Sequence, residues 1–321
     1  MRTTKGKHRQ EAKEEETKMK TQTIGVEIEM SGLTRKEAAE VLAEYFNTSV
    51  KHARGGYDIY EVKDNQHRTW KLMFDSSIHA QKKSNDGIFN TGDDEYKVEL
   101  VTPILKYNDI ENLQEIVRKI RKAGGFVNES CGLHIHIGAE KFTPATLRNL
   151  VNAVASKEKL IYKALKVHED RKGYCKPTDK RFLQELNEKK PETTAQLAAI
   201  WYNKPEEYAL SNLRHYDSSR YTICNLHAFF TKKTIEFRVF NGTLHAGEIK
   251  AYIQFCLALT HQALTTKKAI YRPTETDNEK YTFRCWLLRL NLNGEEFKTC
   301  RLHLLKNLTG DAAWRRAEAT A

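Results

Sequence analysis

Hydrophobic and polar positions alternate in four short stretches, a pattern typical of strands with one buried face. In residues 131–138, Leu133, Ile135 and Ile137 alternate with His134 and His136. The other three stretches carry charged groups on their polar face: Glu27 and Glu29 in residues 22–30, Glu99 in residues 96–102, and Glu236 and Arg238 in residues 234–240. Side chains two residues apart on a strand point the same way, so each stretch presents its polar groups together.

Period-3.6 patterns and capping signals predict the helices. Thr34 with Glu37 forms a capping box that starts a helix, and Thr143-Pro144 supplies an N-cap followed by proline at the first helical position. The predicted helices cover residues 34–46, 108–123, 143–167 and 247–264, with two short ones between 281 and 309.

The remaining segments are less regular. Residues 57–63 and 67–74 are predicted strands, and residues 221–226 are expected to pair with 234–240 as a hairpin. Residues 81–94 are polar and turn-rich, which predicts a loop, and residues 168–220 are mostly helical in character. In that last segment we expect Arg171 and Tyr174-Cys175 to gate a substrate or to border a nucleotide.

Bulk composition narrows the classes of protein. The 321 residues are 40% hydrophobic, enough for a substantial core, and no apolar run reaches the length of a membrane span. Six cysteines without a Cys-x-x-Cys pair favour a reduced, cytoplasmic protein. The net charge of +11 is spread along the chain without an arginine-rich block, so we interpret it as surface charge plus an anion site and disfavour a nucleic-acid partner.

The polar faces of the four strands predict a metal site. If the strands share a sheet, their side chains form a floor of carboxylates with two imidazoles. Carboxylates at such distances repel one another unless a cation neutralises them. Oxygen donors with one imidazole among them suit Mg²⁺.

Four motifs in order resemble the amidoligase family, which belongs with glutamine synthetase and glutamate–cysteine ligase to the carboxylate–amine ligase superfamily. They are Gly-x-Glu-x-Glu ending at Glu29, Glu-Leu-Val-Thr-Pro from Glu99, Cys-Gly-Leu-His-Ile-His ending at His136, and Glu-Phe-Arg ending at Arg238. The resemblance runs from about Ile24 to about Trp314. It implies an α+β fold: a curved, largely antiparallel sheet of the glutamine synthetase catalytic-domain type, with helices on one face and a helical C-terminal appendage.

The resemblance also implies a domain division and an activity. We expect a disordered charged tail in residues 1–20, an amidoligase-like catalytic domain in 21–270, and a helical extension packed on it in 271–321. The implied enzyme is an ATP- and Mg-dependent ligase. It would join a small-molecule or peptide carboxylate to an amine through an acyl phosphate.

Individual residues receive roles from the same resemblance. The implied metal ligands are Glu27, Glu29, Glu99, His134 and Glu236. His136 corresponds to a residue near the ATP phosphates, and Arg238 to an arginine that stabilises the transferred phosphoryl group. We expect Arg238, Glu236 and Glu29 to carry catalysis, and His136, Arg220 and Asp75 to contact the nucleotide or substrate. For Asp75, which starts Asp75-Ser76-Ser77, a simple turn after a strand is an equally good interpretation. Cys131 lies on the Leu133 side by alternation and is assigned to packing.

Two other functions fit parts of the sequence. A zinc hydrolase would use His134 and His136 as ligands, with Glu236 or Glu29 activating water, although carboxylates outnumber imidazoles here. A non-catalytic nucleic-acid-binding protein would use the basic surface and the C-terminal helices. Trp286, Leu287, Leu288 and Leu290 give those helices the composition of a packing surface, which disfavours a DNA reader.

Overall fold

The computed structural model describes residues 14–211, 213, 214 and 216–314. Its centre is an eight-stranded sheet in which every neighbouring pair is antiparallel. In spatial order the strands are β2 (Val50–Arg54), β3 (Ile59–Lys63), β4 (Thr69–Met73), β7 (Val98–Val101), β1 (Ile24–Met30), β8 (Gly132–Gly138), β10 (Thr234–Asn241) and β9 (Cys224–Asn225). The predicted mixed fold with a large antiparallel sheet is therefore confirmed.

The four strands that carry the polar motifs are consecutive neighbours in this sheet. The order β7-β1-β8-β10 places Glu29 opposite Glu99, Glu27 opposite His134, and His136 opposite Glu236. On the other face, Val26, Ile28 and their counterparts on β8 and β10 are buried in the core. The alternation in the sequence thus separates one apolar face from one polar face.

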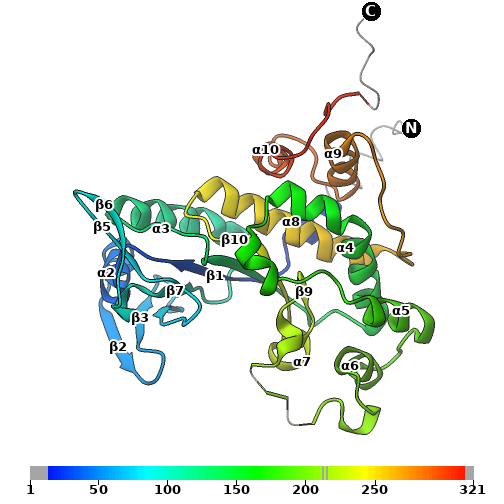
Figure 1. The fold of residues 1–321 in the computed structure, drawn as a ribbon, viewed down its shortest axis with the longest axis horizontal. Coiled ribbons are helices and arrows are strands. Elements are labelled where there is room, and N and C mark those ends of the chain that lie inside the picture. Colours follow the sequence, from blue (N-terminus) through cyan, green and yellow to red (C-terminus); the bar gives the residue numbers. More distant parts are fainter. Residues whose placement is uncertain (1–13, 212, 215, 315–321) are drawn as a thin grey trace, which may run out of the picture.

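Helices cover the apolar face. Figure 1 shows α3 (Ile110–Ala123), α8 (Ala246–Thr265) and α4 (Pro144–Leu165) along one side of the sheet, with α9 (Glu279–Arg289) and α10 (Lys298–Leu305) outside them. The other helices are α2 (Arg35–Phe46), α5 (Lys180–Lys189), α6 (Thr194–Tyr202) and α7 (His227–Lys232). The predicted N-terminal signals are confirmed: Thr34 and Glu37 form a capping box on α2, and Thr143 caps α4.

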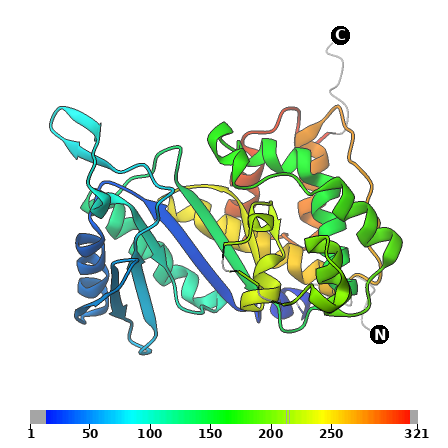
Figure 2. The ribbon, with the colours of Figure 1, turned by 60° about the horizontal axis from the view of Figure 1, so that its bottom comes forward.

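The predicted loop over residues 81–94 is wrong. Residues 81–90 form a hairpin of β5 (Gln81–Ser84) and β6 (Gly87–Asn90), followed by a 3₁₀ turn at Asp94–Tyr96. In Figure 2 the hairpin projects from the same end of the molecule as α2. Most of its side chains are exposed, including Ile88 and Phe89, so it lacks the apolar alternation that marks a half-buried strand. The edge strand β2 was missed for the same reason, because its residues are also mainly exposed.

The predicted hairpin of residues 221–226 with 234–240 is correct in its partners but not in its form. Only Cys224 and Asn225 pair with β10, and the connection between the strands contains α7, which had not been predicted. The mostly helical character predicted for residues 168–220 is confirmed by α5, α6 and several 3₁₀ turns.

The predicted tail divides into two parts. Residues 1–13 lie outside the described residues, whereas residues 14–19 are helical and Met19 is 1% exposed. His261 of α8 lies 2.9 Å from Glu15 across this contact. Disorder is therefore the wrong prediction for residues 14–20, because one buried methionine and an ion pair hold the segment against α8. In the part of the chain described, no helix is long and apolar enough to cross a bilayer.

Candidate metal and ligand site

A cavity of about 640 Å³ opens over the polar face of the central strands. The predicted site residues line it, with the exception of His136. Carboxylates form the floor, and four cationic side chains border the same cavity: Lys71, Lys232, Arg220 and Arg238. The cavity therefore suits a ligand that carries negative charge and shares its site with a cation.

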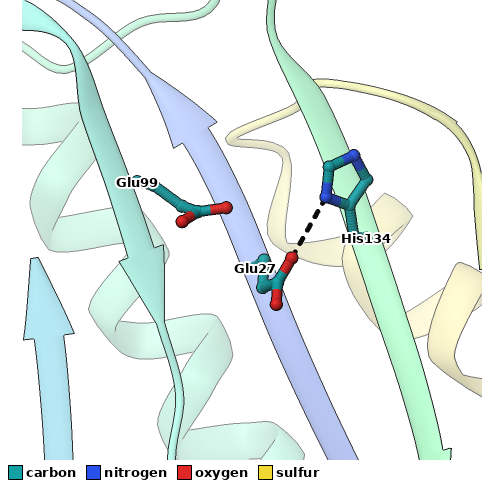
Figure 3. A group of neighbouring side chains, drawn as sticks. All are labelled: Glu27, Glu99 and His134. Carbon is teal, nitrogen blue, oxygen red and sulfur yellow. Dashed lines mark hydrogen bonds and ion pairs between the residues drawn. The ribbon is translucent and has the colours of Figure 1, made fainter. Parts of the chain in front are cut away.

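Among the residues that the structure describes, three groups of side chains have ligand atoms within 4.8 Å of one another: Glu27–Glu99–His134, Glu27–His136–Glu236, and Glu29–Asp75–Glu99. Figure 3 shows the first group, with residues from three adjacent strands turned toward one another. The structure thus brings all five predicted metal ligands together in overlapping sets. It adds Asp75 and His136, for which the sequence predicted nucleotide or substrate contacts.

Each of the two histidines is held through one ring nitrogen and turns the other toward a glutamate. His134 Nδ1 lies 3.2 Å from Glu27 Oε2, and His136 Nδ1 lies 3.0 Å from Thr234 Oγ1. Both Nε2 atoms are buried: His136 Nε2 lies 3.1 Å from Glu27 Oε1, and His134 Nε2 lies 3.7 Å from Glu29 Oε1. Buried imidazole nitrogens that face carboxylates in this way can share a metal ion with them.

Glu99 carries the strongest sign of missing positive charge. Burial, and then the charges of Glu27, Glu29 and Asp75, raise the pKa of Glu99 well above its usual range. No hydrogen bond or ion pair to its carboxylate is found in the described part of the chain. A cation among these carboxylates would offset their mutual repulsion and stabilise the charged form of Glu99.

Glu27 and Glu236 are in the opposite electrostatic situation. Burial alone would raise the pKa of Glu27, but the charge of His136 and hydrogen bonds with both histidines hold it well below the usual value. For Glu236, burial is outweighed by Arg238 and His136, and the pKa falls to about 2. Arg238 donates to Glu236 Oε1, and Asn225 donates to Glu236 Oε2 at 2.5 Å. Glu236 is thus an anion whose orientation is fixed from two sides.

Asp75 is oriented by the turn that follows β4. Ser77 donates to Asp75 Oδ1 through its backbone N–H at 2.7 Å and its hydroxyl at 2.6 Å. The turn interpretation and the site interpretation are therefore compatible, because the turn presents the carboxylate of Asp75 to Glu29 and Glu99.

Arg220 lies at the cavity wall among tyrosines. Its guanidinium carbon is 4.9 Å from the ring centre of Tyr216 and 5.2 Å from that of Tyr221. Tyr57, from the turn between β2 and β3, makes a hydroxyl–hydroxyl hydrogen bond with Tyr216. Sequence reasoning did not identify these tyrosines, Lys71, Lys232 or Asn225 as site residues. Nothing local in the sequence distinguishes them from ordinary surface or core residues. The spacing of Asn225 eleven residues before Glu236 becomes informative only once the β9–β10 pairing is known.

Cys131 and Arg171 do not line the cavity. Burial raises the pKa of the Cys131 thiol to about 12, which suits the packing role assigned to it and leaves it poorly nucleophilic. Arg171, expected to gate a substrate or border a nucleotide, is 2% exposed, and its Nη1 lies 3.8 Å from Glu29 Oε2.

Comparison with known proteins agrees with the motifs. The profile of a protein family described as "Putative amidoligase enzyme" matches residues 20–260, which include β1 to β10 and most of α8. No curated protein matches the chain.

Proposed function

Because the chain belongs to the amidoligase family, we propose that it is an ATP-dependent carboxylate–amine ligase that forms an amide through an acyl phosphate. The observation that carries the proposal is the cavity floor. Four adjacent strands supply carboxylates and imidazoles to one face, and Arg238 lies at its border. In the same proposal the sheet is of the glutamine synthetase catalytic type, since the metal-capable residues other than Asp75 lie on its strands.

The donor set fits Mg²⁺. Carboxylate oxygens dominate all three groups, two buried imidazole Nε2 atoms face glutamates, and burial together with the charges of Glu27, Glu29 and Asp75 raises the pKa of Glu99. Glu27, Glu99 and His134 would hold one ion, Glu29, Asp75 and Glu99 a second, and Glu27, His136 and Glu236 offer a third arrangement. When bound, Mg²⁺ would neutralise these carboxylates and the phosphates of ATP.

The proposed reaction has two balanced steps. In the first, a carboxylate oxygen of the acid substrate attacks the γ-phosphorus of ATP, the bond to the β,γ-bridging oxygen breaks, and ADP leaves. In the second, the amine nitrogen attacks the acyl carbon, the C–O bond to phosphate breaks, and the amine proton ends on the departing phosphate. Neither step needs a nucleophilic side chain, so the protein contributes mainly positioning and electrostatics.

The cations around the cavity have separate tasks in this proposal. Arg238, held by Glu236, offers its remaining N–H groups to oxygens that gain charge during phosphoryl transfer. Lys232, 3.7 Å from Glu27, and Lys71 border other parts of the cavity, where they would orient phosphate or carboxylate groups. Arg220, packed between tyrosine rings, would hold an anionic group at the outer wall.

An oxygen-18 experiment tests the mechanism. Purified protein with Mg²⁺-ATP is screened for ADP release against pooled amino acids, peptides and polyamines, and the active acid is then labelled with ¹⁸O in its carboxylate. We expect one ¹⁸O atom in the released phosphate, because the carboxylate oxygen that attacks phosphorus leaves with it. Glu236→Gln should abolish the transfer, whereas Lys82→Gln on the exposed β5–β6 hairpin should not change it.

Other outcomes would support other functions. ADP release without ¹⁸O transfer would overturn the acyl-phosphate mechanism. Hydrolysis of an amide or ester without ATP, with zinc in the purified protein, would support the hydrolase alternative. Steeply salt-dependent nucleic-acid binding that is independent of Mg²⁺-ATP would support the binding-protein alternative.

A further inference from the structure

Arg171 is almost fully buried directly beside the candidate metal ligands. It belongs to the 3₁₀ turn Glu169–Gly173 that follows α4, far in sequence from the site strands. Its guanidinium lies over Gly132 at the start of β8, where a Cβ atom would be 2.2 Å from Nη1 and 2.4 Å from Nη2. Gly132 is thus the position whose missing side chain makes room for Arg171.

The alternation of β8 explains why this space belongs to the site. Gly132, His134 and His136 are two residues apart, so a side chain at position 132 would point to the same face as the two imidazoles. The register pairs Glu27 with His134 and Ile28 with Leu133, which brings Glu29 next to Gly132. Arg171 therefore occupies the place of a third site-facing side chain on β8.

One guanidinium contacts three of the site strands. Nη2 donates to the backbone oxygen of Arg238 on β10 at 3.2 Å, and Nη1 lies 3.8 Å from Glu29 Oε2 on β1. The same Glu29 oxygen accepts a hydrogen bond from the backbone N–H of Gly132 at 2.6 Å. Oε2 of Glu29 is thereby held from two directions, while Oε1 lies 3.7 Å from His134 Nε2.

We infer that Arg171 is a positioning residue that fixes the Glu29 carboxylate for cation binding and ties it to the strand of Arg238; this inference rests on the proposed function. The guanidinium touches the Glu29 carboxylate and the backbone of β10 but does not line the cavity, so it acts through these groups rather than on substrate. Outer partners of metal ligands typically change metal affinity about 10- to 100-fold when removed. The planar fork aims its donors at Glu29 and at the backbone of Arg238 in a fixed geometry, which a flexible lysine ammonium does not reproduce.

Gly132 provides a second route to the same contact. Gly132→Ala leaves Arg171 in the chain but pushes its guanidinium away from Glu29 and the backbone of Arg238, because the new methyl group takes its place. Arg171→Met removes the guanidinium and keeps most of the apolar stem. If both changes act through one contact, the double variant should bind metal no more weakly than the weaker single variant.

The test is Mn²⁺ binding, measured by calorimetry and by electron paramagnetic resonance of free Mn²⁺, without ATP. Arg171→Met and Gly132→Ala should each weaken binding about 10-fold or more, with non-additive effects in the double variant. The matched control is Gly173→Ala in the same 3₁₀ turn, where a Cβ atom meets no atom within 4 Å and binding should not change. Arg171→Lys, which keeps the charge, should also weaken Mn²⁺ binding and decides the question if the methionine variant does not fold.

Several outcomes would overturn the inference. If the Arg171→Met protein folds and binds Mn²⁺ as tightly as the wild type, Arg171 only fills space and does not position Glu29. If the double variant loses Mn²⁺ affinity by the product of the two single losses, Gly132→Ala and Arg171→Met do not act through one contact. Failure of the wild-type protein itself to bind Mn²⁺ is a different result, which would overturn the metal site of the proposed function.

Discussion

At the scale of single residues, Arg238 combines burial with an orientation toward the cavity. It is 6% exposed, is fixed by Glu236, and packs 5.8 Å from the ring centre of Tyr221. Burial by itself would lower the pKa of Arg238, but the charge of Glu236 outweighs this effect and raises the pKa. Arg238 therefore stays a cation. A group this constrained can stabilise a developing charge without first reorganising.

Arg238→Lys should therefore lower kcat far more than it raises the KM for ATP. A lysine keeps the charge but loses the fork, and loss of one such transition-state contact typically costs about 10²–10³ in rate. Steady-state kinetics with saturating Mg²⁺ provides the measurement. A normal kcat with a large increase in the KM for ATP would mean that Arg238 binds the ground-state nucleotide instead. Lys82→Ala, on the distant hairpin, serves as the control.

At the scale of elements, Arg68 joins the turn between β3 and β4 to the 3₁₀ turn before α3. Its Nε donates to Asp64 at 2.8 Å, and its Nη1 and Nη2 donate to the two oxygens of Asp109 at 2.8 and 3.0 Å. Hydrogen bonds from Arg68, against the opposing effect of burial, lower the pKa of Asp109. The pKa of Asp64 is lowered as well, because hydrogen bonds from Trp70 and Arg68 outweigh its burial.

Arg68→Gln should destabilise the protein by about 2 kcal/mol at pH 7, since it leaves two largely buried carboxylates short of donors. An aspartate whose pKa is lower in the folded than in the unfolded protein stabilises the folded state at pH values above its unfolded pKa, about 3.9. This stabilisation is lost as the pH falls through the pKa of the folded state. The difference between wild type and variant should therefore shrink as the pH falls below the unfolded value of about 3.9. Urea unfolding at pH 7 and at pH 2.5 measures it.

The control for Arg68 is an exposed ion pair of similar chemistry. Arg118→Gln breaks a pair with Glu115 on the surface of α3, where both side chains are about half exposed. Its effect should stay below about 0.5 kcal/mol at either pH. Equal losses for both variants at pH 7 would show that the contacts of Arg68 are worth no more than surface contacts.

At the scale of the whole molecule, α9 and α10 pack closely on α8, the helix in which the match to the family profile ends. Phe283 is 0% exposed, and its ring lies 6.3 Å from Phe255 of α8 and 5.3 Å from Trp286, measured between ring centres. Cys300 of α10 donates to the backbone oxygen of Ala251 of α8. The family profile ends at residue 260, yet the hydrophobic core continues through α9 and α10.

Phe283→Ala should therefore lower the stability of the entire fold, by about 3–5 kcal/mol. During unfolding, the circular dichroism signal, the tryptophan fluorescence and Mn²⁺ binding should all change in the same transition. Leu302→Ala on α10 is the control, because that side chain is 66% exposed and should cost little. Early melting of the C-terminal helices with metal binding retained would instead define them as a separate unit.

Local alternation of apolar and polar residues is enough to assign the two faces of the regular central strands. Side chains alternate with period two along a regular strand, so Glu27 with Glu29 and His134 with His136 had to share a face. Glu236 and Arg238 border the same cavity, but the register of β10 shifts between Phe237 and Phe240, so alternation alone does not decide the face of Arg238. The same local chemistry determined the capping boxes of α2 and α4. The exposed strands β2, β5 and β6 escaped prediction, because a strand without a buried face has no hydrophobic period to detect.

Which of these groups meet depends on how the strands assemble into the sheet. The strand order β7-β1-β8-β10 is a non-local choice that no single stretch encodes, and it brings Glu99 beside Glu29 and His136 beside Glu236. It also turned Asp75 toward the carboxylates and placed Arg171 in the space left by Gly132. These last contacts join residues far apart in sequence through packing, which depends on the whole fold rather than on any local pattern.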